Sequence, residues 1–197
     1  MPLLNPAPPW SNPRSAYIKL WHGCTSADEW HIRLVGITPL LGRPNSDFGR
    51  GFYTTTIKRQ ARHWAWARYY DPQFRRQPGV RPVVLRFSVP RHTLAGLTCI
   101  CFGIGAYNNK DFWSLVQHCR QSNPKANPPV INDHAGPVYD GACHWYDIAC
   151  GPVAAFWKQR SAMHDADQIS FHTTKAASIL TALINSGNKK KYDVTSV

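Results

Sequence analysis

The feature that most constrains the fold of this chain is a pair of glycines before a short β-prone segment, which leads directly into a helix. Gly49 and Gly51 close a loop that begins at residue 36, and residues 51–56 favour a strand. Residues 57–70 then carry apolar side chains on neighbouring turns, the pattern of one helix face. Together with residues 20–25 upstream and residues 167–173 near the end, this segment is expected to form a site.

The rest of the chain mixes short strands and helices. Further strands are expected at residues 17–22, 83–89, 145–150 and 168–172, and further helices at residues 27–35, 111–120 and 173–185. Residues 121–144 are dense in proline, asparagine and glycine, which predicts a long irregular segment. Strands separated by helices without regular βαβ alternation favour an α+β fold over a doubly wound parallel sheet.

The length of 197 residues is typical of one domain with a substantial core. Residues 1–15 contain five prolines and are expected to form an extended arm. The folded domain is expected at residues 16–187. Residues 188–197 begin with three consecutive lysines and are expected to form a polar, basic tail.

Cysteine usage and the first residues bear on where the protein acts. The six cysteines are scattered rather than arranged as a dense framework: Cys24, Cys99, Cys101, Cys119, Cys143 and Cys150. Three of them, Cys24, Cys101 and Cys150, have apolar or aromatic neighbours, which is typical of buried free thiols. No signal peptide is visible, and no run approaches the ~20 apolar residues that span a bilayer. We expect a soluble protein with no membrane partner that acts in a reducing cytoplasm, its own or that of a cell into which it is delivered.

The formal net charge is +12, from 23 lysines and arginines against 11 acids, and favours anionic partners. Six arginines gather in and after the expected helix at residues 57–70: Arg59, Arg62, Arg68, Arg75, Arg76 and Arg81. Aromatic residues lie between them, among them Tyr69, Tyr70 and Phe74. Either this is a solvated face, or it is a surface for pyrophosphate or nucleic acid.

A zinc site is a competing use of the cysteines. Cys99, Cys101, the His118-Cys119 pair and the Cys143-His144 pair carry suitable ligand atoms. Their spacing matches no established zinc motif, and Cys99 and Cys101 lie in an apolar run. We therefore expect no metal centre.

Three separated segments together offer what cleavage of NAD at its nicotinamide ribose requires. The leaving ring is a flat cation, best held between aromatic faces, and the ribose gains positive charge as the bond breaks. His22 and Gly23 end the first strand and supply a polar anchor beside an open backbone. Tyr53 and Trp64 supply two aromatic rings, and Gln168 begins a late strand that can face the ribose.

These segments resemble the ADP-ribosyltransferase superfamily, in the histidine–tyrosine branch that includes diphtheria toxin and the poly(ADP-ribose) polymerases. Residues 20–23 look like the branch's histidine–glycine motif, and residues 49–53 look like its glycine–lysine–glycine–isoleucine–tyrosine motif. The whole pattern is more similar still to a bacterial family of unknown function allied to those transferases. The matching pieces of that family are His22-Gly23, residues 45–56 with Ala61 and Trp64, residues 146–148 with 151–153, and residues 167–173.

The resemblance implies a fold and roles for single residues. The fold would be a split β-sandwich of two sheets with peripheral helices, and NAD would bind between the sheets. His22 would hold a hydroxyl of the adenosine-side ribose, and the Gly23 backbone would hold the nicotinamide carboxamide. Tyr53 would stack on the nicotinamide with Trp64 as the second aromatic, and Thr54 would belong to the same cofactor-binding strand.

Gln168 stands where many superfamily members carry their catalytic glutamate, and it departs from that pattern. Glutamine can hydrogen-bond a ribose hydroxyl, but it cannot carry negative charge or act as a general base. Glu29 is the only glutamate of the chain and lies too close to His22 to match the late position. Transfer of a single ADP-ribose therefore fits better than polymer synthesis.

The expected function is that of a mono-ADP-ribosyltransferase of bacterial toxin or effector type, with NAD as its substrate. Gln168, Tyr53 and His22 are the expected catalytic residues. The acceptor is a protein, RNA or DNA, and an antitoxin or immunity protein is a further conceivable partner. Two alternatives stay open: an NAD glycohydrolase toxin, and a non-catalytic nucleic-acid-binding module on a degenerate transferase fold.

Overall fold

The computed structural model describes residues 15–72, 78–103, 110–120, 146–186 and 192–197, and it contains both strands and helices. The strands are β1 (Tyr17–Thr25), β2 (Phe52–Thr54), β3 (Pro82–Pro90), β4 (Cys99–Cys101), β5 (Ile148–Phe156), β6 (Ser161–Phe171) and β7 (Tyr192–Ser196). The α-helices are α1 (Ser26–Val35), α2 (Lys58–Tyr69), α3 (Arg91–Ala95), α4 (Lys110–Arg120) and α5 (Thr174–Asn185). Two 3-10 turns, η2 (Pro39–Leu41) and η3 (Trp157–Gln159), complete the set.

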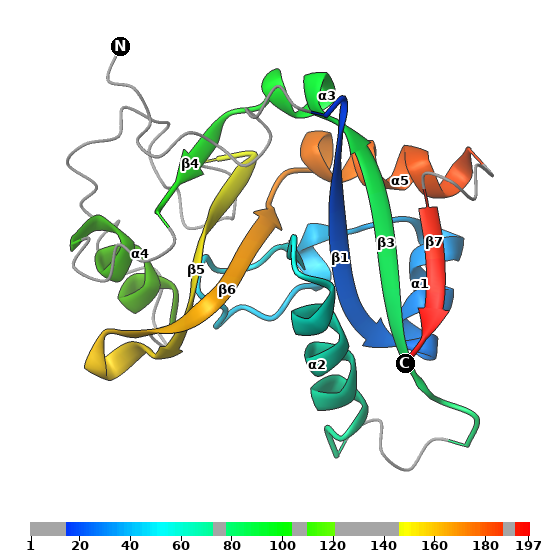
Figure 1. Cartoon of the computed structure of the whole chain (residues 1–197), viewed down its shortest axis with the longest axis horizontal. Coiled ribbons are helices and arrows are strands. Elements are labelled where there is room, and N and C mark those ends of the chain that lie inside the picture. Colours follow the sequence, from blue (N-terminus) through cyan, green and yellow to red (C-terminus); the bar gives the residue numbers. More distant parts are fainter. Residues whose placement is uncertain (1–14, 73–77, 104–109, 121–145, 187–191) are drawn as a thin grey trace.

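The strands form two sheets, which confirms the expected α+β class. One sheet has three antiparallel strands in the order β1-β3-β7. The other has four strands in the order β2-β6-β5-β4, in which only β4 and β5 are parallel. Figure 1 shows the two sheets beside one another, with α2 in front of β1 and α5 behind β3.

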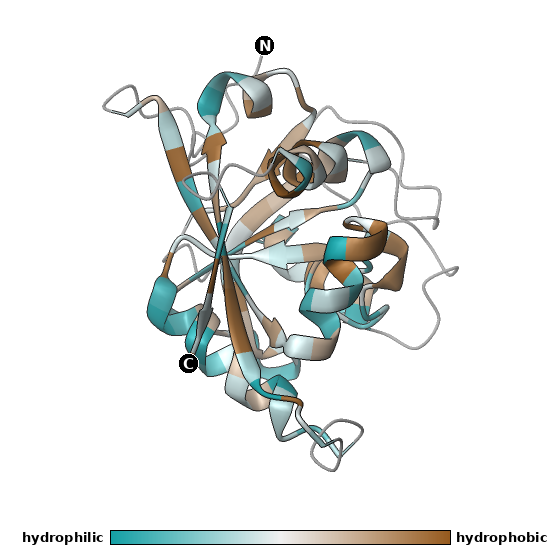
Figure 2. Cartoon of the chain, turned by 90° about the vertical axis from the view of Figure 1, so that its right-hand side faces the viewer, coloured by the Kyte–Doolittle hydropathy of each residue, from teal (hydrophilic) through white to brown (hydrophobic). Residues whose placement is uncertain are grey.

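The two sheets pack on a shared apolar core. Leu20 on β1 and Phe87 on β3 face inward from one sheet, and Phe52 and Phe171 face inward from the other. The rings of Phe52 and Phe87 meet edge to face, with 6.1 Å between their centroids. Complete burial of each such side chain stabilises the fold by about 1.5–3 kcal/mol. Apolar residues appear in brown along several strands and helices in Figure 2.

Helix α2 lies directly against the outer face of β1 at Gly23. A Cβ atom at Gly23 would stand 2.0 Å from the carbonyl oxygen of Ala61 and 2.6 Å from the backbone nitrogen of Ala65. Ala61 and Ala65 are themselves buried, so small residues on both elements allow this contact. The missing side chain of Gly23 therefore makes room for α2, whereas the sequence interpretation assigned that space to a ligand.

Cys101 and Cys150 form a disulfide, so the prediction of free thiols is wrong for these two residues. The parallel register of β4 and β5 places Cys101 opposite Cys150, with 4.8 Å between their Cα atoms. Cys24 and Cys99 are free and buried, Cys119 is buried, and Cys143 lies outside the described residues. The expectation of a reducing compartment rested on free thiols and loses that support.

Several elements differ from the sequence expectation. Residues 192–196, expected within a polar tail, form β7 and pair with β3. Strand β6 covers eleven residues rather than five. Residues 1–14 of the expected arm, residues 188–191 of the expected tail and the whole irregular segment expected at residues 121–144 lie outside the described ranges. Among the helices of those ranges, none combines the length and apolar composition of a membrane span.

Candidate active site

Tyr53 and Gln168 lie on one face of the four-stranded sheet. Tyr53 on β2 pairs with Ser170 on β6, and Gln168 is two residues before Ser170. Side chains two residues apart on a strand point to the same face, and directly paired residues share a face as well. The two predicted residues are thus brought together as diagonal neighbours by the pairing of β2 with β6.

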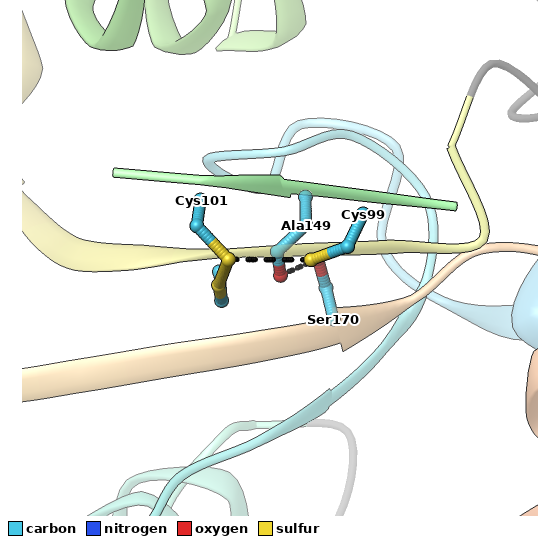
Figure 3. The surroundings of a disulfide bond; sticks show 5 residues. Cys99, Cys101, Ala149 and Ser170 are labelled. Atoms are coloured by element: carbon cyan, nitrogen blue, oxygen red, sulfur yellow. Dashed lines mark hydrogen bonds between the residues drawn. A yellow bond between two sulfur atoms is a disulfide. The ribbon is translucent and has the colours of Figure 1, made fainter. Parts of the chain in front are cut away.

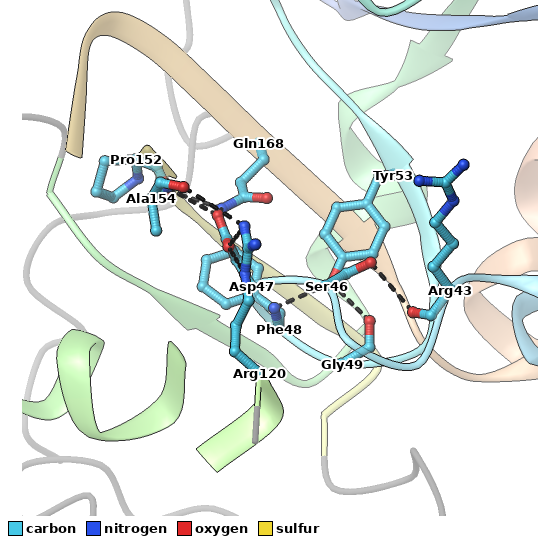
Figure 4. A network of polar contacts seen from close by, with 10 residues as sticks. All are labelled: Arg43, Ser46, Asp47, Phe48, Gly49, Tyr53, Arg120, Pro152, Ala154 and Gln168. Carbon is cyan, nitrogen blue, oxygen red and sulfur yellow. Dashed lines mark hydrogen bonds and ion pairs between the residues drawn. The ribbon is translucent and has the colours of Figure 1, made fainter. Parts of the chain in front are cut away.

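The side chain of Gln168 is 7% exposed, and its amide group is fixed at the nitrogen. Nε2 donates to Asp47 Oδ2 at 2.7 Å and to the carbonyl oxygen of Pro152 at 2.8 Å. The two hydrogens of Nε2 are therefore both used, and Oε1 is left as an acceptor. In Figure 4 Oε1 points away from Asp47 and toward the side on which Tyr53 lies.

The surroundings of residue 168 favour glutamine over glutamate. Asp47 Oδ2 and the carbonyl oxygen of Pro152 are acceptors and cannot donate to a carboxylate. A glutamate oxygen in the place of Nε2 would face a second carboxylate at hydrogen-bond distance, and two such charges do not both stay ionised. The amide is thus the group that fits this site, and position 168 is built for it.

Tyr53 is held by its hydroxyl group. The hydroxyl donates to the carbonyl oxygen of Gly49 at 2.7 Å and accepts from the backbone N–H of Phe48 at 3.0 Å. Burial raises the pKa of Tyr53 well above its ordinary value, so the phenol stays neutral. The loop that contains the two glycines therefore fixes the orientation of the ring.

His22 lies between the sheets and joins β1 to β2. Its Nδ1–H donates to the carbonyl oxygen of Tyr53 at 2.6 Å, and its ring lies 4.2 Å from that of Phe52. Because a carbonyl only accepts, the contact assigns the proton to Nδ1 and leaves Nε2 as an acceptor. Burial lowers the pKa of His22, so the neutral ring is favoured. Phe52 and Tyr53 face opposite sides of β2, so the His22 ring lies on the side opposite the Tyr53 ring.

The backbone of Gly23 points toward the edge of β1 that faces β2. Trp21 exchanges two backbone hydrogen bonds with Thr55, each 2.8 Å long, on the side away from β3. In an antiparallel pair, alternate residues direct their N–H and C=O groups to the same side. The N–H and C=O of Gly23 therefore point to the same side of β1 as those of Trp21, beyond the Trp21–Thr55 bridge. A carboxamide would need backbone groups that point this way.

Trp64 lies on the flank of α2 that faces β6. Gln60, one turn earlier on the same flank, donates to the carbonyl oxygen of Asp167 at 2.6 Å and accepts from its N–H at 3.1 Å. The side chain of Trp64 is 47% exposed. Its ring lies against that of His63 and, in the described part of the chain, does not contact the ring of Tyr53. A nicotinamide between two rings needs a gap of about 7–8 Å, twice an ordinary contact distance of ~3.5–4 Å.

Thr54 does not share the face of Tyr53. Its side chain is 4% exposed and donates to the carbonyl oxygen of Ile169 at 3.0 Å. Neighbouring strand residues face opposite sides, so the Thr54 side chain points into the sheet core. Its predicted place in the cofactor site thus finds no support in the orientation of the side chain.

The described residues that the sequence offered as competing zinc ligands are divided between two cores, and Cys143 and His144 lie outside the described ranges. Cys99 and Cys101 lie in the core between the sheets and α5, whereas Cys119 lies in a separate core around α4. The cysteine that does join them is Cys150, and the three sulfur atoms lie within 4.8 Å of one another. Figure 3 shows Cys99 and Cys101 on the same side of β4. Burial raises the pKa of Cys99, which opposes the thiolate that a metal needs.

Sequence reasoning missed four residues that shape the site. Asp47, itself held by Arg120, accepts from Gln168 on one side of β6, and Gln60 and Asp167 fix α2 to β6 on the other. Asp167 also accepts from the hydroxyls of Thr55 and Thr56 and from the backbone N–H of Thr56. Asp47 and Asp167 each stand at the start of a motif segment, and this position was the only sequence signal that could have pointed to them.

A comparison with protein families gives one match. The model of a family described as a protein of unknown function, DUF3990, matches residues 18–182 of the chain. No curated protein matches the sequence. No solved structure matches it either.

Proposed function

Since the chain belongs to the DUF3990 family, whose function is unknown, its activity has to be inferred from the site, and we propose that it is a mono-ADP-ribosyltransferase. It cleaves NAD and transfers ADP-ribose to a macromolecular acceptor, in the manner of a toxin or effector. The observation that carries the proposal is the fixed amide of Gln168, which presents Oε1 on the face of Tyr53. The two packed sheets with peripheral helices support the split β-sandwich of the transferase superfamily.

The proposed reaction exchanges one glycosidic bond for another. The bond between C1′ of the ribose and the nicotinamide nitrogen breaks, and its electron pair leaves with nicotinamide. The Oε1 atom of Gln168 accepts a hydrogen bond from a ribose hydroxyl, which stabilises the positive charge that develops on the sugar. A nucleophile of the acceptor then bonds to C1′ and releases its proton to water or to a neighbouring group of the acceptor.

The other residues bind and orient NAD in this proposal. His22 Nε2 accepts from a hydroxyl of the adenosine-side ribose, and the Gly23 backbone holds the carboxamide. The ring of Tyr53 stacks on nicotinamide, and Trp64 on α2 is the second aromatic ring of this proposal. Because residue 168 cannot take a proton, the acceptor must be nucleophilic without its help.

Incubation with NAD labelled in its adenine moiety tests the proposal. The purified protein is incubated with labelled NAD, with and without cell lysate, and the products are digested with protease or nuclease. We expect free nicotinamide together with label on a macromolecule, and none of either from the Tyr53→Ala/Gln168→Ala variant. Free ADP-ribose in equal amounts with and without lysate would show a glycohydrolase instead. A wild-type protein that releases no nicotinamide under any condition would contradict both enzymes.

Nucleic-acid binding is the second candidate function, because the outer flank of α2 is basic and aromatic. Arg59, Arg62 and Trp66 are exposed, and Trp66 stacks on Tyr70 with 5.7 Å between ring centroids. Within the described ranges no carboxylate pairs with Arg59 or Arg62. Such a surface suits a single strand, whose phosphates meet the guanidinium groups while its bases stack.

We expect Arg59→Glu/Arg62→Glu to weaken binding of a short single-stranded RNA about tenfold, measured by fluorescence anisotropy. The plot of log K against log salt should become less steep by about 1.4 units of slope, which corresponds to two lost phosphate contacts. The control is Lys19→Glu/Lys158→Glu, which changes the net charge equally at exposed positions elsewhere. Equal weakening by both variants would indicate a response to net charge alone.

A further inference from the structure

Asp47 is a buried carboxylate that reaches Gln168 from a loop 121 residues earlier in the chain. Its side chain is 3% exposed. Oδ2 accepts from Gln168 Nε2 at 2.7 Å and from the N–H of Ala154 at 2.8 Å. Oδ1 accepts from Nε of Arg120 at 2.7 Å and from Nη2 of the same guanidinium. The contacts appear together in Figure 4.

The set of partners requires an acid at position 47. Both oxygens of Asp47 accept hydrogen bonds. An asparagine would place its NH₂ group, a donor, opposite the donors of either Arg120 or the Gln168–Ala154 pair. Arg120, the last residue of α4, balances the charge and is itself partly exposed. The side chain of Asp47 therefore accepts four hydrogen bonds, one of them from the amide of Gln168.

We propose that Asp47 is a positioning residue that orients and polarises the Gln168 amide for the proposed NAD cleavage. A hydrogen bond from Nε2 to an anion shifts electron density toward Oε1, and the effect is larger in a buried site than in water. Oε1 thereby gains part of the negative charge that a glutamate would carry, and it keeps one direction. The inference rests on the proposed function, because only a reacting sugar makes use of that charge.

Two measurements on Asp47→Asn test the inference. We expect kcat for nicotinamide release to fall about tenfold while KM for NAD changes less than twofold, because substrate binding does not depend on the amide direction. In ¹H–¹⁵N spectra of the wild type, the side-chain amide of Gln168, assigned by its loss in Gln168→Ala, should exchange slowly with solvent. In Asp47→Asn the same amide should exchange faster and shift.

The matched control is Asp147→Asn. Asp147 is also a buried carboxylate, directly before β5, where it accepts from Thr98 and Thr173 and not from Gln168. Its loss should lower stability without altering kcat or the Gln168 amide. An equal loss of kcat in both variants would overturn the positioning role and leave a structural one.

The spectra separate this inference from the proposed function. A protected Gln168 amide in a wild type that releases no nicotinamide would refute the proposed function, and with it the catalytic use of the contact. A Gln168 amide that exchanges as fast as a free one would overturn the inference even if the enzyme is active. That wild-type measurement decides the matter if Asp47→Asn does not fold.

Discussion

We expect Gln168→Glu to slow nicotinamide release about 100-fold, although it restores the residue type of many transferases. The new carboxylate would face Asp47 and the carbonyl oxygen of Pro152, which both accept hydrogen bonds. It would either take up a proton or leave the orientation that serves the ribose. Loss of a single well-placed polar group of this kind reduces rates by ~10²–10³ in other active sites. Steady-state release of nicotinamide measures the effect.

The same variant should show a pH-dependent loss of stability. Proximity to Asp47 raises the folded-state pKa of the introduced carboxyl group above its unfolded value of about 4.3. Below that value the new side chain is protonated in both states, and the variant should be close to the wild type. As the pH rises through the folded-state pKa the stability difference should grow to about 2–3 kcal/mol. Thermal melts of both proteins from pH 4 to pH 8 provide the comparison.

Gln159→Glu is the control for both measurements. It makes the same chemical change at an exposed residue of η3 and should leave rate and melting temperature unaltered. A Gln168→Glu protein that is more active than the wild type would show that the site accepts an acid. The conclusion that it is built for an amide would then be withdrawn.

Gly23→Ala should destabilise the protein by about 3 kcal/mol, near the upper end for overpacking in a well-packed interior. The added methyl group would overlap backbone atoms of Ala61 and Ala65, which cannot rotate away as a side chain can. Helix α2 would have to move off β1, and Trp64 would move with it. For a chain of this length the melting temperature should fall by about 6–12 °C.

Gly96→Ala separates this effect from the general influence of a glycine replacement. Gly96 follows α3, has a φ of −86°, and has no atom within 4 Å of the position of its added Cβ. Its replacement should change the melting temperature by less than about 2 °C. Equal shifts in both variants would contradict the direct packing of α2 on β1.

Elements with a clear apolar period were predictable from the sequence. The strand expected at residues 83–89 is β3, and the helices expected at residues 57–70 and 173–185 are α2 and α5, with ends shifted by one or two residues. Their burial follows from their own side chains. The α+β class follows from the same periods, because they fix which elements exist before any contact between them is known.

Elements stabilised by distant partners were not predictable. Strand β4 has three residues, too few for a period, and is defined by its pairing with β5. Strand β7 is only partly buried, and its residues resemble a solvated tail until β3 lies beside them. The outer half of β6 is polar and exposed because it projects beyond the core as a hairpin with β5.

The candidate site divides in the same way. Tyr53, His22 and Gln168 could be named because each stands at a fixed place in a motif segment, and the pairing of β2 with β6 and the contact from His22 to Tyr53 join them. Asp47 could not be named, since it looks like one more polar residue of a glycine-rich loop. Its burial depends on Arg120, which lies 73 residues away, and on partners still further along the chain.

The contact between Asp47 and Gln168 links the evolutionary histories of two distant positions. Replacement of Gln168 by an acid alone places two acceptors opposite one another, and replacement of Asp47 by an amide alone places two donors opposite one another. Either single replacement therefore gives a less stable protein. Descendants of a common ancestor should therefore exchange the two together, an acid at one position accompanying a neutral donor at the other. A search for related proteins that demands a late glutamate would overlook every chain that kept the arrangement seen in this protein.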